Sequence, residues 1–236
     1  MKTIVKQGRC LRHYWRGFLI LTVLATAHAE SLDAIFARMD EASKKLKFVS
    51  ANLHQAEYVA VIDEKTEEDG QLRMKRGKNG MQLLVKFSPP NERTVALDGH
   101  TLWIYKPKGN MAEKHDVTKY TSTNTVEQLL LLSFGAASGA ELQKNYTVTT
   151  DGTETVDSRV TTRVVLVPKS TEMRKEIVRI TLWIPEGQSS AVREKVDKAG
   201  KNYLVYAYSG VDLKTPVPDA EVTLKLPKNV HVVGEK

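Results

Sequence analysis

The sequence predicts a mainly β protein with a few helices, of the α+β class, built largely as an antiparallel meander. The first observation is that apolar residues recur at period two in many short segments, which is typical of strands. The second is that dipeptides with turn chemistry join these segments, so that successive strands pair as hairpins. The third is that two stretches, one near the N-terminus and one near the middle, depart from this period and indicate helices.

The segment 70–107 carries the clearest strand pattern. Four apolar residues share one face of its second strand: Met81, Leu83, Val85 and Phe87. Asn79-Gly80 and Asp98-Gly99 on either side accept the positive φ angles of primed hairpin turns. These features predict three or four strands joined by tight turns.

The strand after Asp98-Gly99 is apolar on both faces. Leu102 and Ile104 fall on one face, and Trp103 and Tyr105 fall on the other. An antiparallel sheet in water needs only one apolar face. We therefore expect helices, another sheet or a ligand to cover the second face.

Residues 1–29 have the pattern of a secretory signal peptide. Basic residues precede an apolar run over 18–27, and Ala27-His28-Ala29 is a small-x-small cleavage site. We expect cleavage before Glu30 and a single mature domain over 30–236, with an uncleaved membrane anchor as the alternative. Cys10 lies before the apolar run, where it cannot be the lipid-modified cysteine of a bacterial lipoprotein, so we expect a soluble mature protein.

The leader accounts for most of the excess positive charge. The whole chain has 35 basic and 28 acidic side chains, and 30 basic ones remain without the five in the leader. This near balance removes the main support for a nucleic-acid partner. Without a cysteine, the mature chain has neither disulfides nor thiolate metal sites, so an apolar core must stabilise it.

Two helical regions interrupt the strands. Residues 31–47 form an amphipathic helix with Ser31 as N-cap, which either packs on the core or covers the mouth of a cavity. Thr125 and Ser138 each begin a capping box. The helix between them is apolar all round at Leu129 to Leu132, so it must be buried, for instance as a plug in an open end of the sheet.

The remaining strands follow from the same pattern. We expect them over 48–62, 111–117, 146–150, 163–167, 177–184, 191–197 and 202–208, with a last one through Val222, Leu224 and Leu226. The acidic run 63–69 is interpreted as a solvated hairpin loop, and Asp151-Gly152 as a turn.

The order and spacing of several motifs resemble those of a known family. After the N-terminal helix come Gly70-x-Leu72-x-x-x-Arg76 and Asp98-Gly-x-x-Leu-Trp-x-Tyr-x-Pro107, then the apolar helical insert, then Val217-Pro218 and Leu226-Pro-x-Asn-Val230. This series resembles the LolA family of periplasmic carriers of outer-membrane lipoproteins. The resemblance implies an unclosed antiparallel β-barrel, with the N-terminal helix and short helices as a lid over an apolar cavity.

The resemblance also suggests site residues. The cavity lining is then Leu72, Met74, Leu83, Val85, Phe87, Trp103 and Trp183, with Leu129, Leu130, Leu131 and Leu132 as the lid. Arg76 matches the family arginine that holds the lid closed, a role that suits the five fixed donors of a guanidinium. Gly77 stands where the family usually has proline. The alternatives are ordinary core residues and, for Arg76, a solvated charge.

The function implied by the resemblance is a periplasmic carrier that binds acyl chains of lipoproteins, or a similar lipid, and delivers them to the outer membrane. An inner-membrane exporter and an outer-membrane acceptor would be its partners. Alternatives are a lipid- or lipoprotein-sensing module of the same fold and a carrier of another lipid. Metalloprotease, hydrolase-elbow and phosphate-loop motifs are absent from the sequence. We expect no enzymatic activity, no cofactor, no nucleic-acid partner and a monomer.

Overall fold

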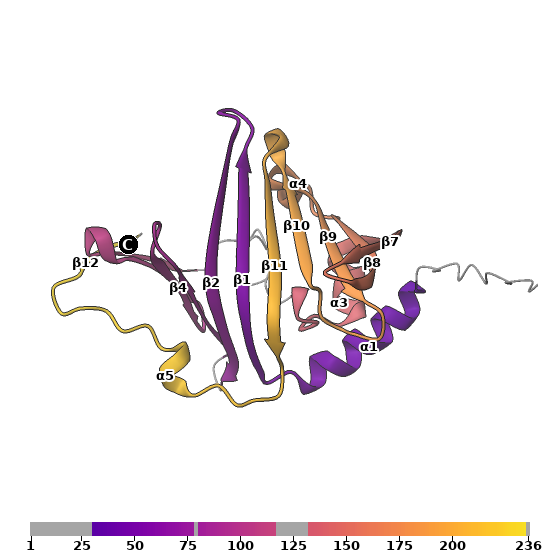
Figure 1. The fold of residues 1–236 in the computed structure, drawn as a ribbon, viewed down its shortest axis with the longest axis horizontal. Helices are drawn as coiled ribbons and strands as arrows, with labels where there is room; N and C mark the ends of the chain where they lie inside the picture. Colours follow the sequence, from indigo (N-terminus) through magenta and orange to yellow (C-terminus); the bar gives the residue numbers. More distant parts are fainter. Residues whose placement is uncertain (1–29, 78–79, 117–131, 235–236) are drawn as a thin grey trace, which may run out of the picture.

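The computed structural model describes residues 30–77, 80–116 and 132–234, which form one twelve-stranded sheet with a few helices (Figure 1). The expected leader, the Thr125 capping box and three lid leucines, Leu129 to Leu131, lie outside the described residues. The two outermost strands do not pair with each other, so the sheet is an unclosed barrel. This confirms the predicted fold class.

All but one of the strand pairs are antiparallel. The strands are β1 (Phe48–Val59), β2 (Glu64–Gly77), β3 (Gly80–Phe87), β4 (Arg93–Asp98), β5 (Thr101–Lys106), β6 (Met111–Asp116), β7 (Tyr146–Val156), β8 (Arg159–Pro168), β9 (Ile177–Pro185), β10 (Arg193–Lys198), β11 (Tyr203–Asp212) and β12 (His231–Gly234). Their order in the sheet is β12-β6-β5-β4-β3-β2-β1-β11-β10-β9-β8-β7. Among the described strands, only the edge strand β12 runs parallel to its neighbour, β6. Strand β1 lies between β2 and β11 and so joins the two halves of the sheet.

The helices lie beside the sheet. They are α1 (Leu32–Lys45), α3 (Gly139–Asn145), α4 (Thr171–Glu176) and α5 (Asp219–Val222), with the 3₁₀ turns η1 (Pro107–Gly109) and η2 (Ala199–Lys201). The Ser31 hydroxyl accepts a hydrogen bond from the amide of Ala34 at the start of α1, as expected of an N-cap. Ser138 and Glu141 form the predicted capping box of α3.

The second apolar face of the central strands is covered by the C-terminal segment. Leu84 and Ala96 are only 3% exposed although they face away from the concave side. Helix α5 contacts β2 and β3 there, and its Val222 is 2% exposed. Helix α5 therefore covers the outer face of β2 and β3. On β5, for which the sequence predicted a cover, Trp103 and Tyr105 are only half-buried.

The close approach of two strands explains why the first residue of the Gly-x-Leu motif, Gly70, is a glycine. A Cβ at this position would lie 2.8 Å from the backbone carbonyl oxygen of Lys86 on β3. Only glycine allows β2 and β3 to approach so closely at this point.

Two sequence-based predictions about charged segments are wrong. The acidic run is the first part of β2, where Glu64 pairs with Val59. Strand β3 pairs with β2 only from Gly70 onward, so this part of the hairpin projects with solvent on both faces and tolerates charge (Figure 1). Asp151-Gly152 is a bulge inside β7, and the β7–β8 turn falls at 157–158 instead.

The last predicted strand is also displaced. Val222 ends α5, and residues 223–230 form no strand. Prolines at 216, 218 and 227 flank the apolar alternation and remove the amides that a ladder needs. The final strand is instead β12, which pairs with β6.

Candidate functional site

The concave face of the sheet is apolar in two adjoining clusters. The first lies under α1, α3 and α4, and its buried members are Ile35, Phe36, Met39, Leu132, Leu142, Tyr146, Val164, Leu166, Met173, Ile177, Ile180, Leu182, Ile184, Ala191 and Val196. The second lies over β1 to β4 and β11, with Leu46, Val49, Ala51, Leu53, Leu72, Met74, Leu83, Val85, Phe87, Val95, Leu97, Phe134, Tyr206 and Tyr208 buried in it. The two clusters adjoin at Leu204, which packs against both, so apolar side chains line most of the concave face.

Five of the seven predicted lining residues come together in the second cluster. They are Leu72, Met74, Leu83, Val85 and Phe87, none of which is more than 6% exposed. Cross-strand pairing explains this, because Leu72 lies opposite Val85 and Met74 lies opposite Leu83. The period-two pattern placed Leu83, Val85 and Phe87 on one face of β3, the resemblance predicted that this face is the inner one, and the structure puts it in the second cluster. Their role as the lining of a lipid cavity stays a prediction.

The other two lining residues lie elsewhere, so the prediction needs correction there. Trp103 is on the outward face of β5, opposite Ala96, with the ammonium of Lys114 5.5 Å from its ring. The inward residues of β5 are Leu102 and Ile104. Because both faces of this strand are apolar, alternation alone did not say which face turns inward.

Trp183 is on the outward face of β9. It is buried in a small separate cluster with Val156 and Val192. Its indole N–H donates to Oε2 of Glu154 at 2.7 Å, and the guanidinium of Arg193 lies 5.5 Å from its ring. This tryptophan therefore does not face the concave side.

An open cavity of about 210 Å³ remains on the concave face. Its apolar lining is Leu53, Val85, Phe87, Val95, Leu102, Ile104, Leu204 and Tyr206, with Gln55, Glu57 and Arg93 as polar members. The Arg93 guanidinium stacks 3.8 Å from the centre of the Phe87 ring and pairs with Glu68 at 2.6 Å. Ligand cavities are usually about 300–1,000 Å³, so this one holds a small apolar group and not a whole lipid.

Residues 132–137, here called the plug segment, occupy the concave face beside this cavity. Leu132 joins the first apolar cluster and Phe134 joins the second. The Phe134 ring lies 4.9 Å from that of Tyr208, and the amide of Ala191 donates to the carbonyl of Ser133 at 2.6 Å. Leu132, the one described lid leucine, is therefore buried against the sheet.

The plug segment also covers a buried carboxyl group that the sequence did not reveal. Glu194 on β10 is fully buried, and the hydroxyl of Ser133 donates to its Oε2. Burial raises the pKa of Glu194 to about 8, against the opposing effect of the neighbouring hydroxyls of Ser133 and Tyr208. Standing between Arg193 and Lys195, Glu194 looked like a surface charge. The one signal in the sequence is that Glu194 is two residues from Val196, so that both side chains lie on the same face of the strand.

Arg76 lies near the end of β2 with an exposed side chain. Arg76 is two residues from Met74 on the same strand, so its side chain leaves the backbone on the concave side. The backbone amide of Arg76 donates to the carbonyl of Lys47 at 2.8 Å. The pKa of Glu141 on α3 is lowered by hydrogen bonds from Ser138 and, to a smaller extent, by the charge of Arg76. The expected contact with the lid involves residues outside the described ranges.

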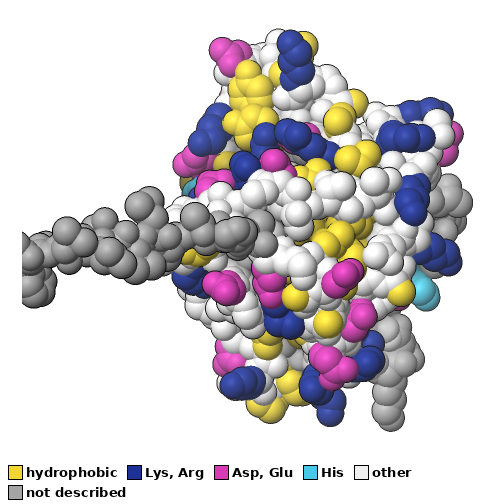
Figure 2. All heavy atoms as spheres, turned by 90° about the vertical axis from the view of Figure 1, so that its right-hand side faces the viewer, with side chains coloured by type: hydrophobic (Ala, Val, Ile, Leu, Met, Phe, Trp, Pro, Cys, Tyr) yellow, Lys and Arg dark blue, Asp and Glu magenta, His cyan; other side chains and the backbone are white. Residues whose placement is uncertain are grey.

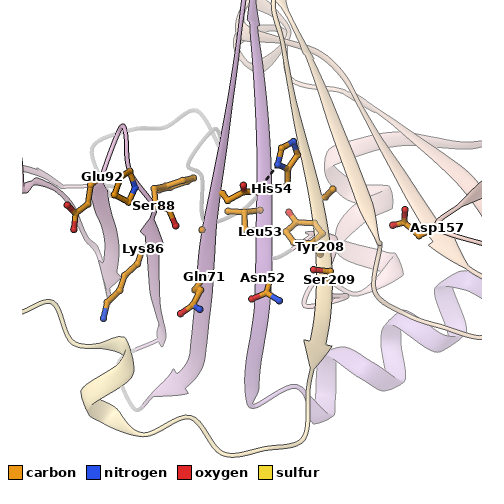
Figure 3. A pocket seen from close by; sticks show the side chains of 15 residues that line it. Asn52, Leu53, His54, Gln71, Lys86, Ser88, Glu92, Asp157, Tyr208 and Ser209 are labelled. Carbon is orange, nitrogen blue, oxygen red and sulfur yellow. Dashed lines mark hydrogen bonds and ion pairs between the residues drawn. The ribbon is translucent and has the colours of Figure 1, made fainter.

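A larger hollow of about 670 Å³ has a mixed lining. It takes polar residues from β1, β2 and β3, among them Asn52, Gln71 and Lys86, together with Leu53, Phe87 and Tyr208 of the second cluster. His54 Nδ1 there lies 2.8 Å from Asp69 Oδ1 (Figure 3). Within the described ranges no cluster of His, Cys, Asp and Glu is arranged to hold a metal ion. The face at the β7 edge intersperses basic and acidic side chains (Figure 2). In the part of the chain that the structure describes, no helix is long and apolar enough to cross a membrane.

Comparison with known proteins agrees with the fold. The profile of the family described as outer membrane lipoprotein carrier protein LolA matches residues 44–219. An uncharacterized conserved protein from Thermus thermophilus is similar in structure, with a TM-score of 0.53 and 13% identity, over 87% of this chain and 100% of that one. A LolA superfamily protein from Nitrosomonas europaea gives 0.42 and 14%, over 83% and 99%. The Mycobacterium tuberculosis lipoprotein LppX gives 0.45 and 15%, over 80% and 100%. At such identities the likeness is one of fold alone, and no curated sequence matches the chain.

Proposed function

Because this chain belongs to the LolA family of outer membrane lipoprotein carrier proteins, we propose that it is a periplasmic carrier for the acyl chains of a lipoprotein or similar lipid. The cargo binds on the concave face and is delivered to the outer membrane. The observation that carries the proposal is the apolar concave side of the sheet, with its two clusters that meet at Leu204.

The energetics favour such a surface. Burying one methylene group is worth about 0.8 kcal/mol, so a chain of some sixteen carbons left in water costs on the order of 10 kcal/mol. Dispersed contacts with aliphatic and aromatic side chains recover this energy without a strong polar anchor. Release then requires only that the apolar surface be covered again.

The plug segment supplies that cover. The cavity of about 210 Å³ is too small for a long chain, so the plug segment must leave for cargo to bind. Leu132 and Phe134 occupy places on the concave face that acyl carbons would take. Exchange between plug and cargo replaces one set of apolar contacts by another, which keeps binding reversible.

Arg76 belongs to the same proposal as the residue that holds the lid closed. Its support is the family motif and its position near the end of β2, on the concave side and close enough to Glu141 of α3 to lower that group's pKa. An exposed guanidinium there can donate hydrogen bonds to backbone carbonyls of a lid.

The test of the carrier function is transfer. The exported protein is incubated with inner-membrane vesicles that contain a labelled acylated lipoprotein, and the soluble complex is then presented to outer-membrane vesicles. A carrier extracts the lipoprotein and hands it over. Extraction without hand-over would favour the sensing module, and failure to extract any acylated ligand would refute the proposal.

A further inference from the structure

The concave face contains one fully buried ionisable group that acyl-chain binding does not use. Glu194 is 0% exposed and lies on β10 between Leu182 of β9 and Tyr206 of β11. Leu182 belongs to the first apolar cluster, and Tyr206 belongs to the second and lines the open cavity. The carboxyl therefore stands where the two halves of the proposed binding surface meet.

Two hydroxyls serve this carboxyl as hydrogen-bond donors. Oε2 accepts from the hydroxyl of Ser133, and the hydroxyls of Ser133 and Tyr208 both act to lower the pKa of Glu194. Tyr208 belongs to β11 of the sheet, whereas Ser133 belongs to the plug segment and leaves with it. Buried polar atoms are nearly always paired, so Oε2 then needs a donor from another source.

We propose that Glu194 is a specificity-determining residue of the lipid site, which exchanges the hydroxyl of Ser133 for a hydrogen-bond donor of the bound lipid. This inference rests on the proposed carrier function. The ligand class is a lipid with an uncharged N–H or O–H donor next to its acyl chain, such as an amide or a glycerol ester, and not a fatty-acid anion.

The surroundings of Glu194 support this choice. Among the described residues, the groups that face it are the phenols of Tyr146, Tyr206 and Tyr208 and the hydroxyl of Ser133. None of these four is a cation, so an anionic headgroup would meet a carboxyl with no positive charge to compensate it. Burial also raises the pKa of Glu194 to about 8, so discrimination against anions should be greatest above that pH.

The experiment compares two lipids of equal chain length, monopalmitoylglycerol and palmitate, at pH 8.5. Their dissociation constants are measured on the mature protein by displacement of an apolar fluorophore. We expect the wild type to prefer the glycerol ester by about tenfold or more, as a hydrogen bond to a charged acceptor implies. Glu194→Gln offers an N–H to the anion and no charge, so it should lose most of that preference.

The matched control is Glu186→Gln, which makes the same chemical change at an exposed position after β9. It should keep the wild-type ratio. Ser133→Ala gives a second readout that does not depend on the folding of Glu194→Gln. Ser133→Ala removes the hydrogen bond from the plug segment to Glu194, so the plug segment is held less firmly on the concave face. The affinities for both lipids should therefore rise by the same factor, and their ratio should stay constant.

Two results would overturn the inference while the carrier function stands. One is equal binding of both lipids by the wild type, and the other is an unchanged ratio in Glu194→Gln. A Ser133→Ala variant whose affinities do not rise would likewise refute the exchange. If the wild type binds neither lipid, the carrier function itself fails and the inference fails with it.

Discussion

Replacement of Glu194 by glutamine should change the pH dependence of folding in a defined direction. The pKa of this carboxyl is raised by burial to about 8, whereas its ordinary value is 4.5. The folded protein therefore holds a proton that the unfolded chain releases. Its stabilising effect is complete below pH 4.5 and is lost as the pH rises through about 8. Glutamine has the same shape and binds no proton, so Glu194→Gln lacks this dependence.

The magnitude follows from linkage. Each pH unit between the two pKa values is worth about 1.4 kcal/mol, so the wild type should lose about 4 kcal/mol relative to Glu194→Gln between pH 5 and pH 8. Other titrating groups contribute equally to both proteins and cancel in the difference. The phenol pKa values nearby are raised by burial, that of Tyr146 to about 12, so these groups do not titrate in this range.

The assay is urea denaturation of both proteins at pH 5, 6, 7 and 8. A constant offset between the two stability curves would reflect only the different hydrogen bonds of an amide and a carboxyl. The prediction concerns the slope of their difference. Parallel curves over the whole range would contradict this prediction, because they would mean that Glu194 titrates alike in the folded and unfolded chain.

Three further predictions concern packing and the lid. Gly70→Ala places a methyl group 2.8 Å from the carbonyl oxygen of Lys86 and should cost about 1–3 kcal/mol in urea denaturation, whereas Gly77→Ala meets only ordinary contacts; equal costs would contradict this. Val222→Asp puts a charge under α5 and should speed hydrogen exchange in β2 and β3, and unchanged exchange would show that α5 is not a tight cover. Arg76→Leu should slow hand-over of a labelled lipoprotein without affecting loading, and lysine should rescue it poorly. Equal transfer rates for the wild type, Arg76→Leu and Arg76→Lys would show that Arg76 is a surface charge with no role in the lid.

Alternation predicted most of the sheet because it reports directly on burial. Leu83, Val85 and Phe87 share one phase of β3 and lie on the concave side, while Leu84 between them is buried on the outer face. Alternation did not predict whether the side chain of Trp103 points inward or outward, because both faces of its strand are apolar. The orientation depends on what packs over each face. Leu102 and Ile104 pack against the second cluster, whereas Trp103 has the ammonium of Lys114 5.5 Å from its ring.

Charged residues were the second source of error, because charge indicates exposure only on average. The acidic run at the start of β2 does form a strand, since both of its faces are in solvent and backbone pairing with β1 holds it. Glu194 lies in an equally polar sequence but is buried, because the plug segment covers it. Neither outcome follows from local sequence, as both depend on which segments pack there.

Binding of a long acyl chain to two variants of β5 tests directly whether the concave face is the lipid site. Ile104 lines the concave cavity and Trp103, its neighbour, faces outward; both are half-buried, so a glutamate at either position should leave the fold intact by circular dichroism. We expect Ile104→Glu to lower the affinity for a fluorescent palmitoyl probe at least about tenfold, since it places a charge against the chain. Trp103→Glu should bind as the wild type does. Wild-type binding by Ile104→Glu, or a loss confined to Trp103→Glu, would show that the concave face is not the lipid site.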